Sequence, residues 1–202
     1  MRWKQTTSAC RRGVSPSPWG RGNSSAFQIP GMRETGRLQF FFHSPSSELP
    51  IRDVLDEQHH GCKTEPYIEK CAENYCSPCD PQNVLGFLRS EEKYLFLFTT
   101  FRNRKYENKR FIVGYIKKRS ALLRRKHGIE WWCVQGPTKI VSFDHAYALD
   151  RSVAGPYYRT IRRRKLDECQ TAKVLAKIEK GPNILSRCIA EIERLSQHID
   201  VA

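Results

Sequence analysis

The sequence predicts an α+β fold in which a mainly β region, residues 38–150, is followed by C-terminal helices. Two observations support this prediction. Strand-length apolar runs such as YLFLFTTF and RFIVGYI are separated by polar turns between residues 91 and 143. Beyond residue 165 the apolar residues recur at helical steps of three and four instead. With 202 residues, 39% of them hydrophobic, the chain can form one domain with its own core.

The first 37 residues differ from the rest, because they are rich in Ser, Gly, Pro and Arg and show no helix or strand period. We therefore predict a disordered basic extension over residues 1–37. Either it is an arm that contacts a nucleic-acid backbone or it has no structural role. The domain proper is expected to begin at residue 38.

Strands and short helices are expected to alternate through the β region. A helix is predicted after Ser46 or Ser47 and ends near His59. The other predicted elements are an aromatic strand over 37–44, a hairpin of strands over 91–101 and 110–119, a basic helix-like segment over 120–128, two strands within 129–143 joined by a turn at Gly136, and a short helix near 143–149.

Residues 151–202 are predicted to form a basic segment and helices that pack on the β region. The first helix, within 165–180, is stopped by Gly181 and Pro182. The second carries an apolar stripe formed by Leu185, Cys188, Ile192, Leu195 and Ile199. This stripe packs on the domain or on a protein partner.

The charge distribution indicates a polyanion-binding surface. The formal net charge is +14, and residues 101–126 contain eleven Lys/Arg and one acidic residue, Glu107. Residues 151–165 add six Lys/Arg and no acidic residue. Nucleic acid, DNA or RNA, is the expected partner.

A membrane is not expected, because no apolar run approaches the roughly 20 residues of a membrane span and no secretory signal is visible. A cytoplasmic or nucleoid-associated location follows.

Four of the eight cysteines crowd into one segment, with the spacing Cys62-x8-Cys71-x4-Cys76-x2-Cys79. Four thiolates complete the tetrahedral shell of a structural zinc ion, so this segment is predicted to be a loop stapled by zinc. An iron–sulfur cluster, free thiols or disulfides are the alternatives, and His59 or His60 could replace one thiolate. Cys133 and Cys188 are interpreted as small core residues.

The β region resembles the PUA-like superfamily, which includes the EVE, ASCH and YTH domains. The resemblance rests on the strand Ile112–Ile116 and on the aromatic strand that runs from Trp131 to a turn at Gly136. It implies a small, mainly antiparallel β-barrel that binds RNA or DNA, often by taking one base into an aromatic pocket. Trp131 and Trp132 are adjacent in a strand, so one faces the core and the other a binding surface.

These observations favour a nucleic-acid-binding module that reads an extruded or modified base. An iron–sulfur enzyme acting on nucleic acid and a non-catalytic subunit of a ribonucleoprotein or other complex are the alternatives. No convergent catalytic group or phosphate loop is found, so an enzyme is the less favoured interpretation. The candidate nucleic-acid-binding residues are Arg102, Arg104, Lys117, Lys118, Arg119, Arg124, Arg125, Trp131, Trp132, Arg162, Arg163 and Arg164.

Overall fold

The computed structural model describes residues 31–41, 43–45, 47–51, 74–76, 81–101, 109–126, 129–154 and 164–197. For residues 74–76, 81, 124–126, 129–131 and 196–197 it describes the backbone alone. These parts of the chain form a mixed α+β fold with two sheets and four helices, which confirms the predicted class.

The larger sheet has six strands, in the order β7-β4-β3-β1-β9, with β8 paired to β4 as well. Its centre is β3, which runs antiparallel to β4 and parallel to β1. The strands are β1 (Arg33–Phe40), β3 (Glu92–Thr100), β4 (Arg110–Lys117), β7 (Thr138–Ile140), β8 (Tyr147–Ala148) and β9 (Lys165–Leu166).

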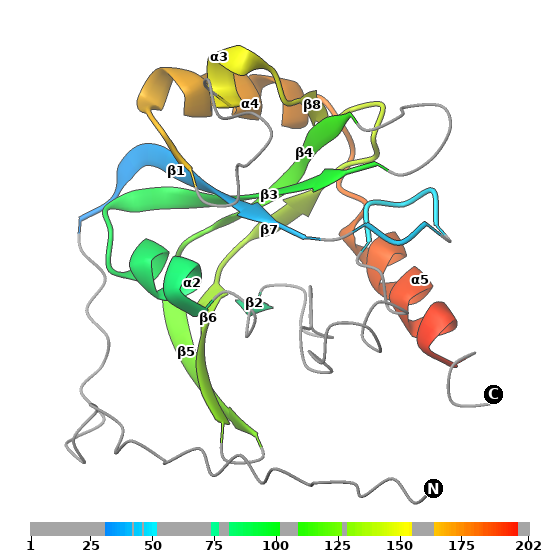
Figure 1. Ribbon diagram of the computed structural model, residues 1–202, viewed down its shortest axis with the longest axis horizontal. Helices are drawn as coiled ribbons and strands as arrows, with labels where there is room; N and C mark the ends of the chain where they lie inside the picture. The colour runs from blue at the N-terminus through cyan, green and yellow to red at the C-terminus, as the bar shows by residue number, and fades with distance from the viewer. Residues whose placement is uncertain are drawn as a thin grey trace, which may run out of the picture.

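The smaller sheet consists of three antiparallel strands in the order β2-β6-β5. These strands are β2 (Asn74–Cys76), β5 (Ser120–Lys126) and β6 (Ile129–Gln135). The hairpin of β5 and β6 extends away from the larger sheet (Figure 1). In the described residues neither sheet closes on itself, because β7 and β9 stand at opposite ends of the larger sheet. The closed barrel that the resemblance implied is therefore not observed in this part of the chain.

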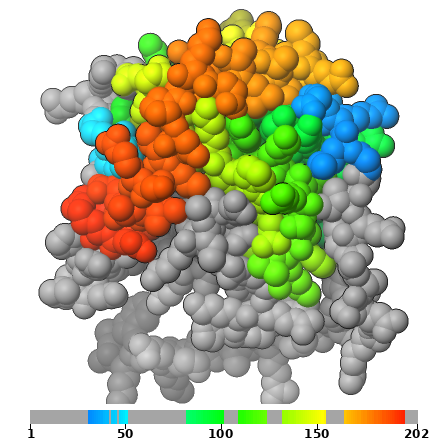
Figure 2. All heavy atoms as spheres, turned by 180° about the vertical axis from the view of Figure 1, so that it is seen from behind, coloured from blue at the N-terminus to red at the C-terminus, as the bar shows by residue number. Residues whose placement is uncertain are grey.

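Helices cover both faces of the larger sheet, with α4 on one side and α2 and the smaller sheet on the other (Figure 1). Seen from behind, α4 and α5 spread over the upper part and one side of the molecule (Figure 2). The core between these layers contains the fully buried rings of Phe87, Phe96 and Phe98. The helices are α2 (Pro81–Leu88), α3 (Arg151–Ala154), α4 (Glu168–Ile178) and α5 (Leu185–Gln197).

The predicted hairpin of β3 and β4, the strands on either side of Gly136 and the two C-terminal helices are all confirmed. The apolar stripe of α5 packs on the protein's own core, where Cys188 is fully buried and Ile192 and Leu195 are partly buried. Packing within the chain therefore accounts for the stripe, and the stripe does not support the predicted protein partner for this helix.

Three predicted elements require correction. The strand predicted over residues 37–44 begins earlier, at Arg33, because Arg33–Phe40 pairs in parallel with β3. The segment 120–128 is not helix-like: residues Ser120–Lys126 form β5, since pairing with β6 overrides the helix propensity of its Ala, Leu and Arg residues. Residues 143–149 form a turn and the short strand β8, and α2 was not predicted. The helix predicted after Ser47 lies mainly outside the described residues.

A glycine is required at position 136 because two chain segments approach each other closely there. It lies between β6 and β7 with φ of +156°, a conformation that favours glycine. A Cβ atom at this position would lie 1.8 Å from the carbonyl oxygen of Lys117. The root of the β5–β6 hairpin therefore tolerates no side chain there.

We expect Gly136→Ala to lower the free energy of unfolding by at least about 2 kcal/mol, through backbone strain and this clash. Urea denaturation followed by circular dichroism measures the change. Gly31→Ala is the matched control, because nothing lies within 4 Å of a Cβ at Gly31. Equal free energies of unfolding for Gly136→Ala and Gly31→Ala would contradict the close approach of Gly136 to the carbonyl oxygen of Lys117.

Candidate nucleic-acid interface

The β5–β6 hairpin brings basic and aromatic positions together across one ladder. Arg124 pairs with Trp131, and Leu123 pairs with Trp132. At the root of the hairpin, Lys117 and Arg119 are exposed. Residues 117–135 contain six Lys/Arg and one acidic residue, Glu130. This stretch therefore holds more than half of the twelve candidate residues that the sequence indicated.

The structure distinguishes the two adjacent tryptophans. Trp132 is partly buried and packs against the main core, as does the fully buried Val134. Successive positions of a strand belong to opposite faces, and every second position shares a face. Position 131 therefore belongs to the same face as Cys133, which forms a separate small cluster with Leu122. Trp132 is the core residue of the pair, and position 131 is the candidate for a base contact.

Lys118 is not a surface residue, although the sequence analysis grouped it with the candidate nucleic-acid ligands. It is 1% exposed, and its Nζ donates hydrogen bonds to the carbonyl oxygens of Phe87 (3.1 Å) and Ser90 (2.7 Å). The ammonium lies 4.8 Å from the centre of the Phe87 ring. Burial lowers the pKa of Lys118 to about 8. In the connection between β4 and β5, Lys118 is buried while its neighbours Lys117 and Arg119 face solvent.

The remaining basic candidates are described in part. Arg102, Arg104, Arg162 and Arg163 lie outside the described residues, and only the backbone is described for Arg124 and Arg125. Arg164 is half-buried and donates a hydrogen bond from its guanidinium to the carbonyl oxygen of Ala154. It also lines a pocket that the sequence analysis did not anticipate.

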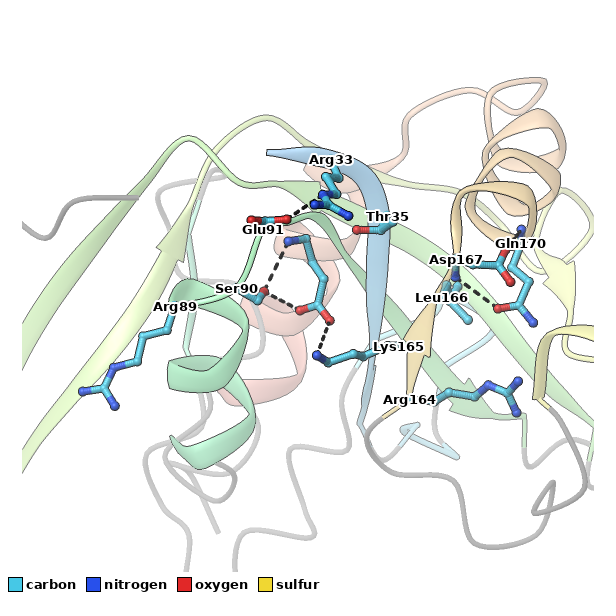
Figure 3. A pocket seen from close by; sticks show the side chains of 11 residues that line it. Arg33, Thr35, Arg89, Ser90, Glu91, Arg164, Lys165, Leu166, Asp167 and Gln170 are labelled. Atoms are coloured by element: carbon cyan, nitrogen blue, oxygen red, sulfur yellow. Dashed lines mark hydrogen bonds and ion pairs between the residues drawn. The ribbon is translucent and has the colours of Figure 1, made fainter. Parts of the chain in front are cut away.

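This pocket lies between the C-terminal end of α2, the start of β1, β9 and the first turn of α4 (Figure 3). Its volume is about 750 Å³. Four basic and three acidic residues are among its lining side chains, which are those of Arg33, Thr35, Arg89, Ser90, Glu91, Glu92, Arg164, Lys165, Leu166, Asp167 and Gln170. No sequence motif marks it, because its residues come from segments far apart in the chain.

Glu92 is the buried charge in this pocket, with a side chain that is 6% exposed. Its Oε2 forms an ion pair with Arg37 (2.8 Å) and accepts a hydrogen bond from the Ser90 hydroxyl (2.5 Å). Its Oε1 is buried and forms an ion pair with Lys165 Nζ at 3.8 Å. The carboxylate of Glu92 therefore lies between two cationic side chains, those of Arg37 and Lys165.

Three aromatic candidates of the larger sheet, Tyr94, Phe96 and Tyr115, pack against one another. Tyr94 and Phe96 are buried, with rings 5.8 Å apart. Tyr115 contacts both rings and donates a hydrogen bond to Glu179 (2.6 Å). Burial and this hydrogen bond raise the pKa of Tyr115.

Cys133 is joined in a disulfide and is fully buried, which corrects its interpretation as a simple core residue. The β2–β6 ladder places Cys76 directly opposite Cys133. Residues directly opposite in an antiparallel pair have Cα atoms about 4.5–5.5 Å apart, a separation that a disulfide spans. Cys188, in contrast, is a free buried thiol whose pKa is raised to about 12 by burial.

The predicted metal site remains a prediction. Cys62, Cys71 and Cys79 lie outside the described residues, and for Cys76 only the backbone is described. Among the residues with described side chains, no group of three or more His, Cys, Asp or Glu could hold a metal ion. If Cys76 is the disulfide partner of Cys133, three cysteines and His59 or His60 would be left as zinc ligands.

Comparisons with known proteins leave the family open. No protein-family model matches the chain, and a search of curated proteins finds no significant match. Within the described part of the chain, none of the helices is long and apolar enough to span a membrane.

We expect the stability of the protein to increase between pH 8 and pH 10 through Lys118. The lowered pKa means that, in this interval, the unfolded chain binds more protons at Lys118 than the folded chain does, so stability rises with pH. Urea titrations at several pH values measure the slope.

The Lys118→Met variant should lack this contribution, while the exposed Lys173→Met variant should retain it. Identical pH slopes for the wild type and Lys118→Met would show that Lys118 is not buried as a charge.

We expect a proteolytic digest without reductant to contain a peptide pair that joins Cys76 to Cys133 and separates when dithiothreitol is added. Mass spectrometry identifies the pair, and metal analysis of the same anaerobically purified sample measures zinc and iron. Recovery of Cys133 joined to another cysteine would contradict the Cys76 assignment. Absence of both metals would refute the metal prediction.

Proposed function

We propose that the chain is a nucleic-acid-binding module whose contact surface is the β5–β6 hairpin together with its root at Lys117 and Arg119. The observation that carries this proposal is the cross-strand pairing of Arg124 with Trp131 next to two exposed basic residues. A cation and an aromatic ring in adjacent positions can contact a phosphate and an unstacked base of one nucleotide.

The energetics of such a surface divide between charge and stacking. Basic side chains release counterions from the phosphate backbone, which gives affinity that falls as salt rises. An aromatic side chain supplies about 1–3 kcal/mol per stacked base with little sequence preference. The hairpin extends from the body of the protein, so a single strand could reach it without approaching the acidic residues on α4 and α5 (Figure 1).

The fold family is also part of this proposal. A relationship to PUA-like domains is supported by the strand pattern from Ile112 to Gly136, and the open order of the larger sheet departs from it. Nucleic-acid binding by the hairpin does not depend on that relationship. Nor does it depend on a metal ion in the cysteine segment, which would act as a structural staple.

We expect a fluorescent single-stranded oligonucleotide, tested as DNA and as RNA, to bind the full chain with salt-dependent affinity. Lys117→Gln combined with Arg119→Gln should reduce the slope of log K against log salt by about 0.7 for each phosphate that the variant no longer neutralises. Trp131→Ala should weaken binding by about 1–3 kcal/mol and leave the slope unchanged. Fluorescence anisotropy at several salt concentrations measures both effects.

The charge-matched control is Lys173→Gln combined with Arg187→Gln, two exposed residues of α4 and α5. It removes the same charge from another surface and should bind as the wild type does. An equal loss of affinity in both double variants would show that net charge alone drives binding. No binding of either oligonucleotide would refute the proposed function.

A further inference from the structure

We propose that a disulfide between Cys76 and Cys133 is a redox switch that controls nucleic-acid binding by the β5–β6 hairpin. In the oxidised state it holds β2 against β6 and keeps the contact face of the hairpin ordered. Reduction by a dithiol releases β2 and weakens binding. This inference rests on the proposed function and adds a means of regulating the same surface.

Cys133 is the described end of this switch. It is joined in a disulfide and is fully buried. The strand β2 lies beside β6 (Figure 1), and the ladder between them places Cys76 directly opposite Cys133. An antiparallel pair in direct register has the Cα separation that a disulfide spans. The register therefore assigns Cys76 as the partner.

The strand β2 is too short to be held firmly by its ladder alone. It consists of three residues, Asn74–Cys76, and so forms few hydrogen bonds with β6. The disulfide joins positions more than fifty residues apart, and closing a loop of this length removes much of the conformational freedom that favours separation of the two strands. We therefore expect β2 to leave β6 when the disulfide is reduced.

The two faces of the hairpin depend on the disulfide to different degrees. On one face, Trp132 and Val134 of β6 pack against the main core, so this face stays in place in either redox state. On the other face, Cys133 packs with Leu122 in a small separate cluster. Reduction should therefore loosen one face of the hairpin without unfolding the domain.

The face that contains Cys133 is also the proposed contact face. Positions 131 and 133 share one face of β6, because every second position of a strand does. Across the ladder they pair with Arg124 and Leu122 of β5, respectively. The disulfide thus lies next to the proposed base contact on the same face. Ordering of side chains at binding costs free energy, so a contact face that is loose before binding has a lower affinity.

Reduction follows thiol–disulfide exchange, and the reductant that it requires is a dithiol. One thiolate of the dithiol attacks a sulfur of the disulfide, forms a mixed disulfide and displaces the other cysteine, which takes up a proton. The second thiol of the reductant loses its proton, attacks the mixed disulfide and releases the remaining cysteine as a thiol. The protein disulfide has then accepted two electrons and two protons, and the dithiol has become a disulfide. Because Cys133 is fully buried, we expect the first attack at the sulfur of its partner.

The two other cysteines with described side chains are not suited to this role. Cys188 is fully buried, and burial raises the pKa of its thiol to about 12, which keeps it unreactive. Cys169 is exposed on α4 and is a free thiol, so it provides a control. The sequence predicts a cytoplasmic or nucleoid-associated location, where disulfides are usually transient, catalytic or redox-sensing.

The test measures binding of the fluorescent oligonucleotide to the full chain by anisotropy, before and after reduction with dithiothreitol. We expect reduction to weaken binding by about three- to tenfold, which corresponds to the cost of ordering one side chain at binding. Reoxidation should restore the first value. Cys133→Ala should bind as weakly as the reduced wild type in both conditions, whereas Cys169→Ala should respond as the wild type does.

Hydrogen exchange followed by mass spectrometry tests the physical basis of the switch on the wild-type chain, whether or not Cys133→Ala folds. Reduction should speed the exchange of peptides that cover β2 and residues 129–133 and leave that of β3 unchanged. A uniform increase that includes β3 would mean global destabilisation and would contradict a local switch.

Equal affinities of the oxidised and reduced wild type would overturn the inference and leave the proposed function standing. So would a Cys133→Ala variant that still responds to dithiothreitol, or unchanged exchange of β2 and residues 129–133 after reduction. If the oligonucleotide binds in neither state, the proposed function fails, and the regulation inferred from it fails too.

Discussion

The ion pair between Arg37 and Glu92 is the contact that links three elements of the described fold, β1, β3 and α2. It joins β1 to β3 in a region where the two side chains are 11% and 6% exposed. A buried pair of this kind gains little net energy, because desolvation offsets most of the attraction. The pair instead fixes the positions of neighbouring elements. Arg37 also donates a hydrogen bond to the carbonyl oxygen of Asn83 in α2 (3.2 Å), and Glu92 accepts one from the Ser90 hydroxyl just beyond that helix. Loss of either partner would leave the other as a buried charge without this ion pair.

Lys118 extends this polar layer to the hairpin. Its ammonium is held at the carbonyl end of α2, and its backbone N–H donates to the carbonyl oxygen of Lys93 in β3 (2.8 Å). The next residue, Arg119, donates its backbone N–H to Gln135 of β6 (2.8 Å). The chain therefore leaves the larger sheet and enters the smaller one at a point fixed by hydrogen bonds. This arrangement determines the direction in which Lys117 and Arg119 face solvent.

The sequence predicted those elements whose signal is local. The continuous apolar run of β3 and the periodic apolar stripe of helix α5 were both recognised, because burial on two faces and helical spacing leave direct patterns. It failed where pairing between distant segments decides the structure. The segment Ser120–Lys126 has the composition of a helix and becomes a strand through β6, and Cys133 gains its role from β2, more than fifty residues earlier. Glu92 is one of 21 acidic residues, and only the fold shows that it is buried.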